Sequence, residues 1–264
     1  MKFEKIKIED LDKLNQLSPN GWGDVASKIE IYLKLDFCHS VKLVENNVIL
    51  GIGTAIFYKY TSWIAHLIVN EKYRKNGYGT QILNYLCDYC KNNTYKTILL
   101  FATDMGYPLY IKYGFKIQTE YVRYEKTIEN EYNPNNIRNI EINDYEKIFE
   151  LDKLITGEDR HILLLQYLNN GFVYHKNNNI MGFYLQNLGE GLIIANNEEA
   201  GLELLKLRII NNRNSTIPTD NIFGNNYFLK NKFKEIMKIR RMIYGNEIEC
   251  KNENIYNRIG GNFG

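Results

Sequence analysis

The sequence predicts an α+β protein that uses one architecture twice. Near the start of each half, Ile6 to Leu17 and Ile140 to Leu151 share the pattern I-x-I-x-D-x-x-K-(L/I)-x-x-L without a gap. Near the end of each half, LYIKYGFKI at 109–117 is echoed by YFLKNKFKEI at 227–236. Alternating runs, together with a strand-helix-strand order in the first half, predict a mixed, mostly antiparallel twisted sheet flanked by helices.

The elements of the first half follow from periodicity, with strands alternating every second residue and helices repeating every three to four. The repeated segment is a short strand, then an Asp that caps an amphipathic helix. Glu45, Asn46 and Asn47 favour a hairpin turn between two alternating runs. In chain order we expect a strand at 3–8, helices at 11–17 and 24–35, a hairpin over 40–60, a strand at 62–69, a helix from about 80, a strand at 97–103, a short helix at 106–114 and a closing strand at 115–126.

A polar, Asn-rich segment at 128–139, which contains Pro134, separates the two halves. Such a composition suits a linker or a crossover between domains. The sequence therefore predicts one domain at residues 1–132 and a second at 133–264.

Composition narrows the class of partner. The chain of 264 residues carries 33 Lys and Arg against 31 Asp and Glu, a formal net charge of +2, which gives no electrostatic reason to expect nucleic acid. It contains neither a signal-peptide pattern at its start nor an apolar run of about 18 residues. We expect a cytoplasmic protein that acts on neither membranes nor nucleic acids.

The four cysteines, at 38, 87, 90 and 250, are too few and scattered for a disulfide framework. Cys87 and Cys90 form a C-x-x-C, but they share a helix face with Ile82, Leu83 and Leu86. No second Cys or His pair completes a tetrahedral site. Core packing is therefore favoured over a redox or metal role, and no metal is expected.

The chemistry of the first half concentrates in His66 to Leu83, HLIVNEKYRKNGYGTQIL. An apolar strand runs into a loop and then into a helix, whose first turn offers unpaired N–H groups and a partial positive charge. Gly77 and Gly79 leave these amides accessible, while Arg74 and Lys75 add charge. The stretch is therefore interpreted as a phosphate site, with a plain strand-to-helix turn as the alternative.

This stretch resembles the acetyl-CoA loop of the GNAT superfamily of N-acetyltransferases, (Q/R)-x-x-G-x-(G/A), with Arg74, Gly77 and Gly79 at its defined positions. The segment LYIKYGF resembles the closing Y-x-x-x-G-F of that family, with Tyr110, Gly114 and Phe115 in place. Because the order of elements also agrees from residue 3 to about 126, the resemblance covers the whole first half.

The resemblance implies an acetyl-CoA site and two GNAT-like domains with the acyl-CoA N-acyltransferase fold. The strand backbone would pair with the pantetheine arm as if it were an added strand, and the loop would hold the pyrophosphate. The fourth and fifth strands would splay apart, commonly at a bulge, to admit the thioester. The implied cofactor-binding residues are Leu67, Ile68, Val69, Arg74, Lys75, Asn76, Gly77, Tyr78, Gly79 and Thr80.

Acetyl transfer to an amine requires removal of a proton from nitrogen and stabilisation of the leaving thiolate. Tyr110 stands where the family carries its general acid, with packing in a tyrosine-rich chain as the alternative. His66 is the candidate base, direct or through water; otherwise it is a hydrogen-bonded core histidine and water alone carries the proton away. The developing oxyanion would meet a strand amide near Val69.

In this family the acceptor pocket forms mainly from the first two helices and their connection, which here makes Trp22 and Asp24 candidates, with help from Phe37 and His39. Asp24 could attract an amine, or it could simply cap the second helix. The acceptor itself, whether a small molecule or a peptide amine, stays open.

The second half lacks these features. Glu198 and Glu199 stand where phosphate would bind, Phe228 replaces Tyr110, and Lys232 replaces Gly114. We therefore expect a degenerate GNAT-like domain that shapes the acceptor side or replaces a dimer partner, so that a monomer is favoured over a homodimer. The segment 152–164 is interpreted as a helix start with Thr156 as N-cap and Asp159 as its capping partner. Alternatively, Arg160 and Asp152 could line a ligand cleft between the domains.

Together these observations predict an N-acetyltransferase that moves the acetyl group of acetyl-CoA to a primary amine by direct attack. Two rivals stay open at this point. One is a non-catalytic protein with this fold that senses acyl-CoA or a small amine, and the other is an enzyme that uses a longer acyl donor.

Overall fold

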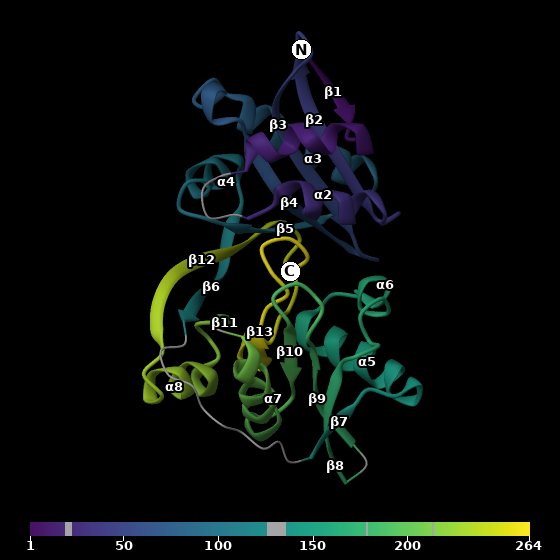
Figure 1. The fold of residues 1–264 in the computed structure, drawn as a ribbon, viewed down its shortest axis with the longest axis vertical. Coiled ribbons are helices and arrows are strands. Elements are labelled where there is room, and N and C mark those ends of the chain that lie inside the picture. Colours follow the sequence, from purple (N-terminus) through teal and green to yellow (C-terminus); the bar gives the residue numbers. More distant parts are fainter. Residues whose placement is uncertain (19–22, 126–135, 178, 213) are drawn as a thin grey trace.

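The computed structural model describes residues 1–18, 23–125, 136–177, 179–212 and 214–264. The chain forms an eight-stranded sheet, in the order β1-β2-β3-β4-β5-β12-β6-β11, and a five-stranded sheet, in the order β13-β10-β9-β8-β7. Figure 1 shows the first half, in purple to teal, above the second half, in green to yellow. The expected α+β class with mixed, mostly antiparallel sheets is confirmed, since β4 and β5 form a parallel pair among antiparallel neighbours.

The elements of the first half follow the expected order. Asn46 and Asn47 have φ values of 48° and 63°, so they form the tight turn that their position predicts. The elements are β1 (Lys2–Lys5), α1 (Leu11–Leu14), α2 (Val25–Leu33), β2 (Cys38–Glu45), β3 (Val48–Phe57), β4 (Thr61–Val69), α3 (Tyr78–Asn92), β5 (Thr97–Ala102), α4 (Tyr107–Tyr113) and β6 (Lys116–Glu125).

The second half repeats this order, and its strands β11 and β12 join the sheet of the first half. Its elements are β7 (Ile137–Asn139), α5 (Tyr145–Thr156), α6 (His161–Leu164), β8 (Phe172–Lys176), β9 (Asn179–Leu185), β10 (Leu192–Ala195), α7 (Glu198–Asn211), β11 (Asn214–Pro218), α8 (Ile222–Lys230), β12 (Lys234–Gly245) and β13 (Ile255–Asn257).

The repeated opening segments adopt the same local structure. Asp10 and Asp144 each stand at the start of a helix, but each carboxylate turns back to accept the backbone N–H three residues earlier, of Lys7 at 2.9 Å and of Glu141 at 2.8 Å. These aspartates therefore fix the strand-to-helix corner rather than bonding to the helix amides that follow them.

Two strands cross between the halves. β12, from the second half, lies between β5 and β6 and pairs antiparallel with both, while β11 pairs with the outer edge of β6. In Figure 1, β12 runs from the lower half up beside β6. The halves therefore share one sheet. The boundary predicted at 132/133 falls at 126–135, outside the described residues, and stays a prediction.

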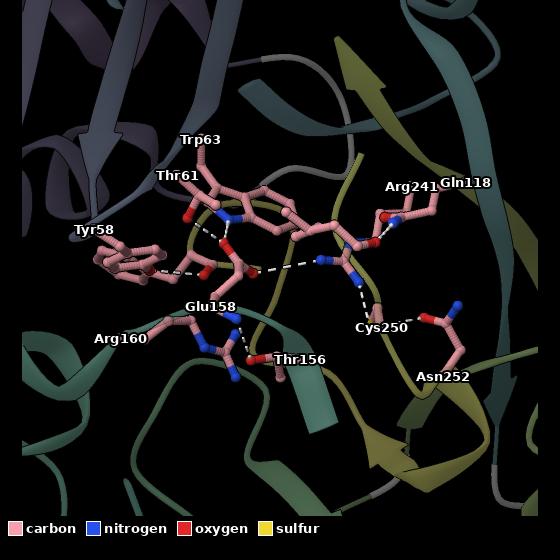
Figure 2. A network of polar contacts seen from close by, with 12 residues as sticks. Tyr58, Thr61, Trp63, Gln118, Thr156, Glu158, Arg160, Arg241, Cys250 and Asn252 are labelled. Carbon is pink, nitrogen blue, oxygen red and sulfur yellow. Dashed lines mark hydrogen bonds and ion pairs between the residues drawn. The ribbon is translucent and has the colours of Figure 1, made fainter. Parts of the chain in front are cut away.

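A buried polar cluster joins the halves, and Figure 2 shows its members. The Glu158 carboxylate, only 1% exposed, accepts hydrogen bonds from Thr61 Oγ1 at 2.7 Å and from Trp63 Nε1 at 2.8 Å. Arg241 of β12 lies 3.4 Å from the second carboxylate oxygen. A buried carboxylate needs such donors, so this contact fixes the second half against the start of β4.

The segment 152–164 differs from the expectation. Thr156 is the last residue of α5, not an N-cap, because Gly157 follows it in the left-handed conformation (φ 72°) that ends a helix. Arg160 forms a bidentate pair with Asp152, at 3.1 and 2.6 Å, in the filled interface. The space beside Arg160 is about 10 Å³, enough for one water molecule and too small for the ligand cleft considered above.

Candidate functional site

The site forms where β4 and β5 separate. They pair in parallel from Thr61 opposite Thr97 to Ile64 opposite Leu100, and the ladder ends there. Directly after this point β4 carries a bulge, in which His66 and Leu67 oppose the single residue Gly53 of β3. His66 has a φ of 47°, which is uncommon for a residue other than glycine. The bulge and splay expected from the family resemblance are therefore present.

Glycines on β3 let α3 approach this part of the sheet. A Cβ atom at Gly51 would lie 2.7 Å from the Ile82 side chain, and one at Gly53 would lie 2.6 Å from that of Leu86. Both neighbours belong to the buried face of α3. The close packing carries the N-terminus of α3 to the level of Leu67 to Val69.

The α3 N-terminus has no side-chain cap. Gly77 occupies the N-cap position with a φ of 79°, and the first backbone bond of the helix runs from Gln81 N–H to the Gly77 carbonyl. The amides at the start of a helix lack intrahelical acceptors and carry a partial positive charge. This first turn is therefore suited to an anion.

The side chains of the preceding loop divide into two roles. Arg74 donates from Nε to the Val69 carbonyl at 3.3 Å and lies 3.6 Å from Glu71, which ties the loop to β4. Asn76 donates to the carbonyls of Tyr73 and Arg74, at 3.1 and 3.3 Å, and so shapes the turn. Lys75 borders the cleft described next.

A cleft of about 760 Å³ gathers most of the predicted cofactor residues. Asn76, Thr80, His66 and Asp24 do not border it. Its walls are the free end of β4, the α3 N-terminus, the turn from β5 into α4, α4 itself and β12. The residues are Leu67, Ile68, Val69, Arg74, Lys75, Gly77, Tyr78, Gly79, Phe101, Thr103, Asp104, Met105, Gly106, Leu109, Tyr110, Met237 and Lys238.

Tyr110 points into this cleft from α4. Gly106 makes room for it, since a Cβ atom there would lie 2.9 Å from the Tyr110 ring. The side chain is 8% exposed, and burial raises the pKa of its hydroxyl above the ordinary value. Because its pKa is raised, the hydroxyl keeps its proton near pH 7, and since no described residue hydrogen-bonds to it, it is available to donate to a ligand.

His66 faces α2 and not the phosphate end of the cleft. Its Nδ1 atom lies 2.8 Å from the hydroxyl of Tyr32, in a hydrogen bond. Burial, with a smaller contribution from Lys28, lowers the pKa of His66 to about 4. The imidazole is therefore neutral near pH 7 and a weak base.

The acceptor-side candidates lie elsewhere. Asp24 caps α2 by accepting from Ser27 N at 3.1 Å and from the Ser27 hydroxyl, and these hydrogen bonds lower its pKa. Its capping alternative is thus observed, while its role toward an acceptor stays a prediction. Phe37 is buried in the core, and His39 stacks on Tyr89 of α3. Trp22 lies outside the described residues.

Cys87 and Cys90 are fully buried in the α3 core, where desolvation raises their pKa values to about 12 and about 11, so the packing interpretation is confirmed. Within the described residues no group of three His, Cys, Asp or Glu side chains could hold a metal ion. The helices of the described part are also too short or too polar to cross a membrane.

Sequence reasoning missed Met237 and Lys238, because β12 lies far along the chain and its pairing with β5 has no local signal. It also missed Gly51 and Gly53, although two glycines in an otherwise apolar strand can indicate a close approach of another element.

Comparison with known proteins agrees with this geometry. The family model described as the acetyltransferase (GNAT) family matches residues 8–115. No curated protein matches the chain in a sequence search. A crystal structure named for an acetyltransferase from Pyrococcus horikoshii is similar over 97% of this chain and 93% of its own, with a TM-score of 0.82 and 24% identity.

A GCN5-related N-acetyltransferase from Anabaena variabilis is similar over 92% of this chain and 72% of its own, with a TM-score of 0.58 and 13% identity. At these identities the two structures show the fold, and they show it across both halves. For the first half, the family model adds similarity in sequence to the similarity in fold. The class of reaction that this match supports is acyl transfer. Residues 8–115 of this chain are therefore similar in sequence to the acetyltransferase (GNAT) family.

Proposed function

We propose that this protein is an acetyl-CoA-dependent N-acetyltransferase that acts on a primary amine by direct transfer. One observation carries the proposal: a single cleft joins the free end of β4, the uncapped start of α3 and the buried hydroxyl of Tyr110. These are an edge for an extended arm, an anion site and a proton donor.

In this proposal the cofactor lies along β4. The backbone of Leu67 to Val69 is free of β5 and pairs with the pantetheine amides, as an added strand would. The pyrophosphate sits on the first amides of α3, with Arg74 and Lys75 beside it. Asn76 supports the turn, and the exposed Thr80 can offer its hydroxyl from the first helical turn.

The transfer forms one bond and breaks another. The neutral amine nitrogen attacks the thioester carbonyl carbon, and the Val69 amide stabilises the oxyanion. When the tetrahedral intermediate collapses, the carbon–sulfur bond breaks and the sulfur leaves with the electron pair. Tyr110 donates its proton toward that sulfur and is later reprotonated from solvent. The products are an amide and CoA with a free thiol, because the proton that water takes from the nitrogen balances the proton that solvent returns to Tyr110.

We propose that water, and not His66, removes the proton from the acceptor. The low pKa of His66 makes its imidazole a poor acceptor near pH 7, and its Nδ1 is already engaged by Tyr32. His66 then serves to hold the bulge that turns β4 away from β5. The acceptor amine approaches from the α2 side of the sheet, where Asp24 stays a candidate for contact; Trp22, outside the described residues, stays a sequence-based candidate.

The test is a thiol-release assay of the purified full chain with acetyl-CoA and a broad panel of small amines and peptides. Mass spectrometry should identify an acetylated product for at least one amine. CoA binding without thiol release across the panel would instead favour a non-catalytic acyl-CoA sensor. Release from a longer acyl-CoA but not from acetyl-CoA would replace the proposed donor.

A further inference from the structure

β12 of the second half forms part of the wall of the candidate acyl-CoA cleft. Its pairing with β5 starts at Arg240, opposite Ala102, the last residue of β5. The residues before Arg240 continue to pair with β6, where Lys238 stands opposite Val122. This part of β12 therefore extends past the end of β5 and has the cleft, not a strand, on its other side.

Lys238 faces the α4 side of the sheet. It lies two residues before Arg240 without a register shift between them, so both side chains project to the same face. The Arg240 guanidinium lies over the ring of Tyr107 in α4, 4.6 Å from its centroid. Lys238 thus borders the cleft on the side formed by α3 and α4.

The local charges leave Lys238 available to a ligand. Asp104 is the acidic side chain of the cleft wall, and Arg240 already binds it at 2.6 Å. Lys238 is exposed and forms no ion pair with any described residue. Its ammonium group therefore adds an unneutralised positive charge to a cleft that already holds Arg74, Lys75 and the start of α3.

We propose that Lys238 is a phosphate-binding residue of the acyl-CoA site, supplied by the second half of the chain. This inference rests on the proposed function. A flexible lysine suits a phosphate as a point charge. CoA offers two phosphate groups that Lys238 could bind, the pyrophosphate and the 3′-phosphate. In either case the second half completes the cofactor site of the first, which gives it a role although its own start of α7 carries acids.

Isothermal titration of the full chain with CoA and with dephospho-CoA tests this. Lys238→Gln should weaken CoA binding by about tenfold, the size of one charge-assisted contact. If the partner is the 3′-phosphate, dephospho-CoA binding should be unchanged; if it is the pyrophosphate, both ligands should weaken alike. Lys238→Arg should keep most of the affinity.

Lys234→Gln is the matched control, because Lys234 is exposed on the same strand but lies outside the cleft wall. Thermal unfolding should show that both variants fold as the parent does. Wild-type affinity of Lys238→Gln for both ligands would overturn the inference and leave the proposed function intact. Failure of the parent protein to bind CoA at all would instead remove the proposed function.

Discussion

The two halves of the chain differ at the edge of their fourth strand, β4 in the first half and β10 in the second; the space beside this edge is called the slot below. In the first half the end of β4 has a free edge, and α3 begins at Gly77 without a side-chain cap. In the second half the corresponding strand β10 is paired on that edge by β13, the last strand of the chain. A ligand can use the first slot, whereas the chain itself fills the second.

The start of α7 is likewise occupied. Asn197 caps it by accepting the Ala200 N–H at 2.9 Å. Glu199 adds negative charge there and is held by Tyr174 and Lys176, at 2.7 and 2.9 Å. Gly201, in the next turn, lies against the Tyr256 ring from β13, where a Cβ atom would come within 2.1 Å. The shared fold is therefore not sufficient for an acyl-CoA site, which also requires an open strand edge and an uncapped helix start.

Tyr110→Phe should have the largest effect, since it gives α4 the residue found at the matching position of α8. Phe228 is fully buried there and stacks on Tyr124, so it serves packing. Turnover should fall by roughly 10² to 10⁴-fold, because the leaving thiolate loses its proton donor, while CoA affinity stays nearly unchanged. Steady-state kinetics and titration measure the two quantities.

Tyr113→Phe is the control, because Tyr113 lies on the same helix outside the cleft and hydrogen-bonds to Lys91 at 3.1 Å. Its turnover should stay close to that of the parent. Equal turnover of Tyr110→Phe and Tyr113→Phe would remove Tyr110 from the mechanism.

Thr80→Glu copies the acidic first turn of α7 into α3. CoA should bind about tenfold more weakly or worse, because the new carboxylate adds negative charge to the first turn of α3, where the pyrophosphate is proposed to bind. The free energy of unfolding should meanwhile rise by about 0.3 to 1 kcal/mol, since an acid at a helix N-terminus is favourable. Titration measures the loss of CoA affinity and urea unfolding measures the gain in stability, with Thr80→Gln as the uncharged control. Unchanged CoA affinity would place the phosphates elsewhere.

Gly77→Ala and Gly79→Ala test two different reasons for a glycine in this loop: the backbone conformation at Gly77 and the room for the ligand at Gly79. Gly77 has a left-handed φ of 79°, so alanine there should lower the free energy of unfolding by about 1 kcal/mol. A Cβ atom at Gly79 meets Leu109 at 3.5 Å and Val69 at 3.6 Å, which are ordinary contacts, so Gly79→Ala should fold normally. Because its methyl group enters the cleft wall, it should weaken CoA binding. If urea unfolding showed Gly79→Ala to be destabilised and Gly77→Ala to be as stable as the parent, this explanation of the loop would be wrong.

The smallest effect is expected from protonation of His66. Its pKa of about 4 lies below the ordinary value near 6.5, so the unfolded chain binds the proton more readily between these values. The free energy of unfolding should therefore fall as the pH drops from about 6.5 to 4, and this component should be missing in His66→Gln. The turnover of the parent should show no step from His66 above about pH 6. Such a step, abolished in His66→Gln, would make His66 the base after all.

The sequence contains the local parts of this structure but not its long-range pairing. The turn at Asn46 and Asn47 and the helix that begins at Tyr78 follow from residue types within a few positions. β12 follows from no such pattern, because which strands it lies between depends on residues more than a hundred positions away. Met237 and Lys238 therefore entered the cleft without any signal in the sequence.

The candidate site divides in the same way. The loop from Arg74 to Gly79 was recognisable, because glycines and cations at a helix start have a direct physical meaning. The weak basicity of His66 was not, since it depends on burial and on Lys28, which lies in α2, far from β4 in the sequence. The misplaced cap at Thr156 could have been avoided, because a glycine directly after an amphipathic helix favours a helix end.

The most direct test of the central claim is the stoichiometry of CoA binding to the full chain, measured by isothermal titration of the parent protein and of Thr80→Glu. One CoA should bind per chain of the parent, and Thr80→Glu should lose most of that binding, because the edge of β4 is open whereas β13 pairs with the matching edge of β10. Two CoA molecules per chain, or one that Thr80→Glu leaves untouched, would contradict it.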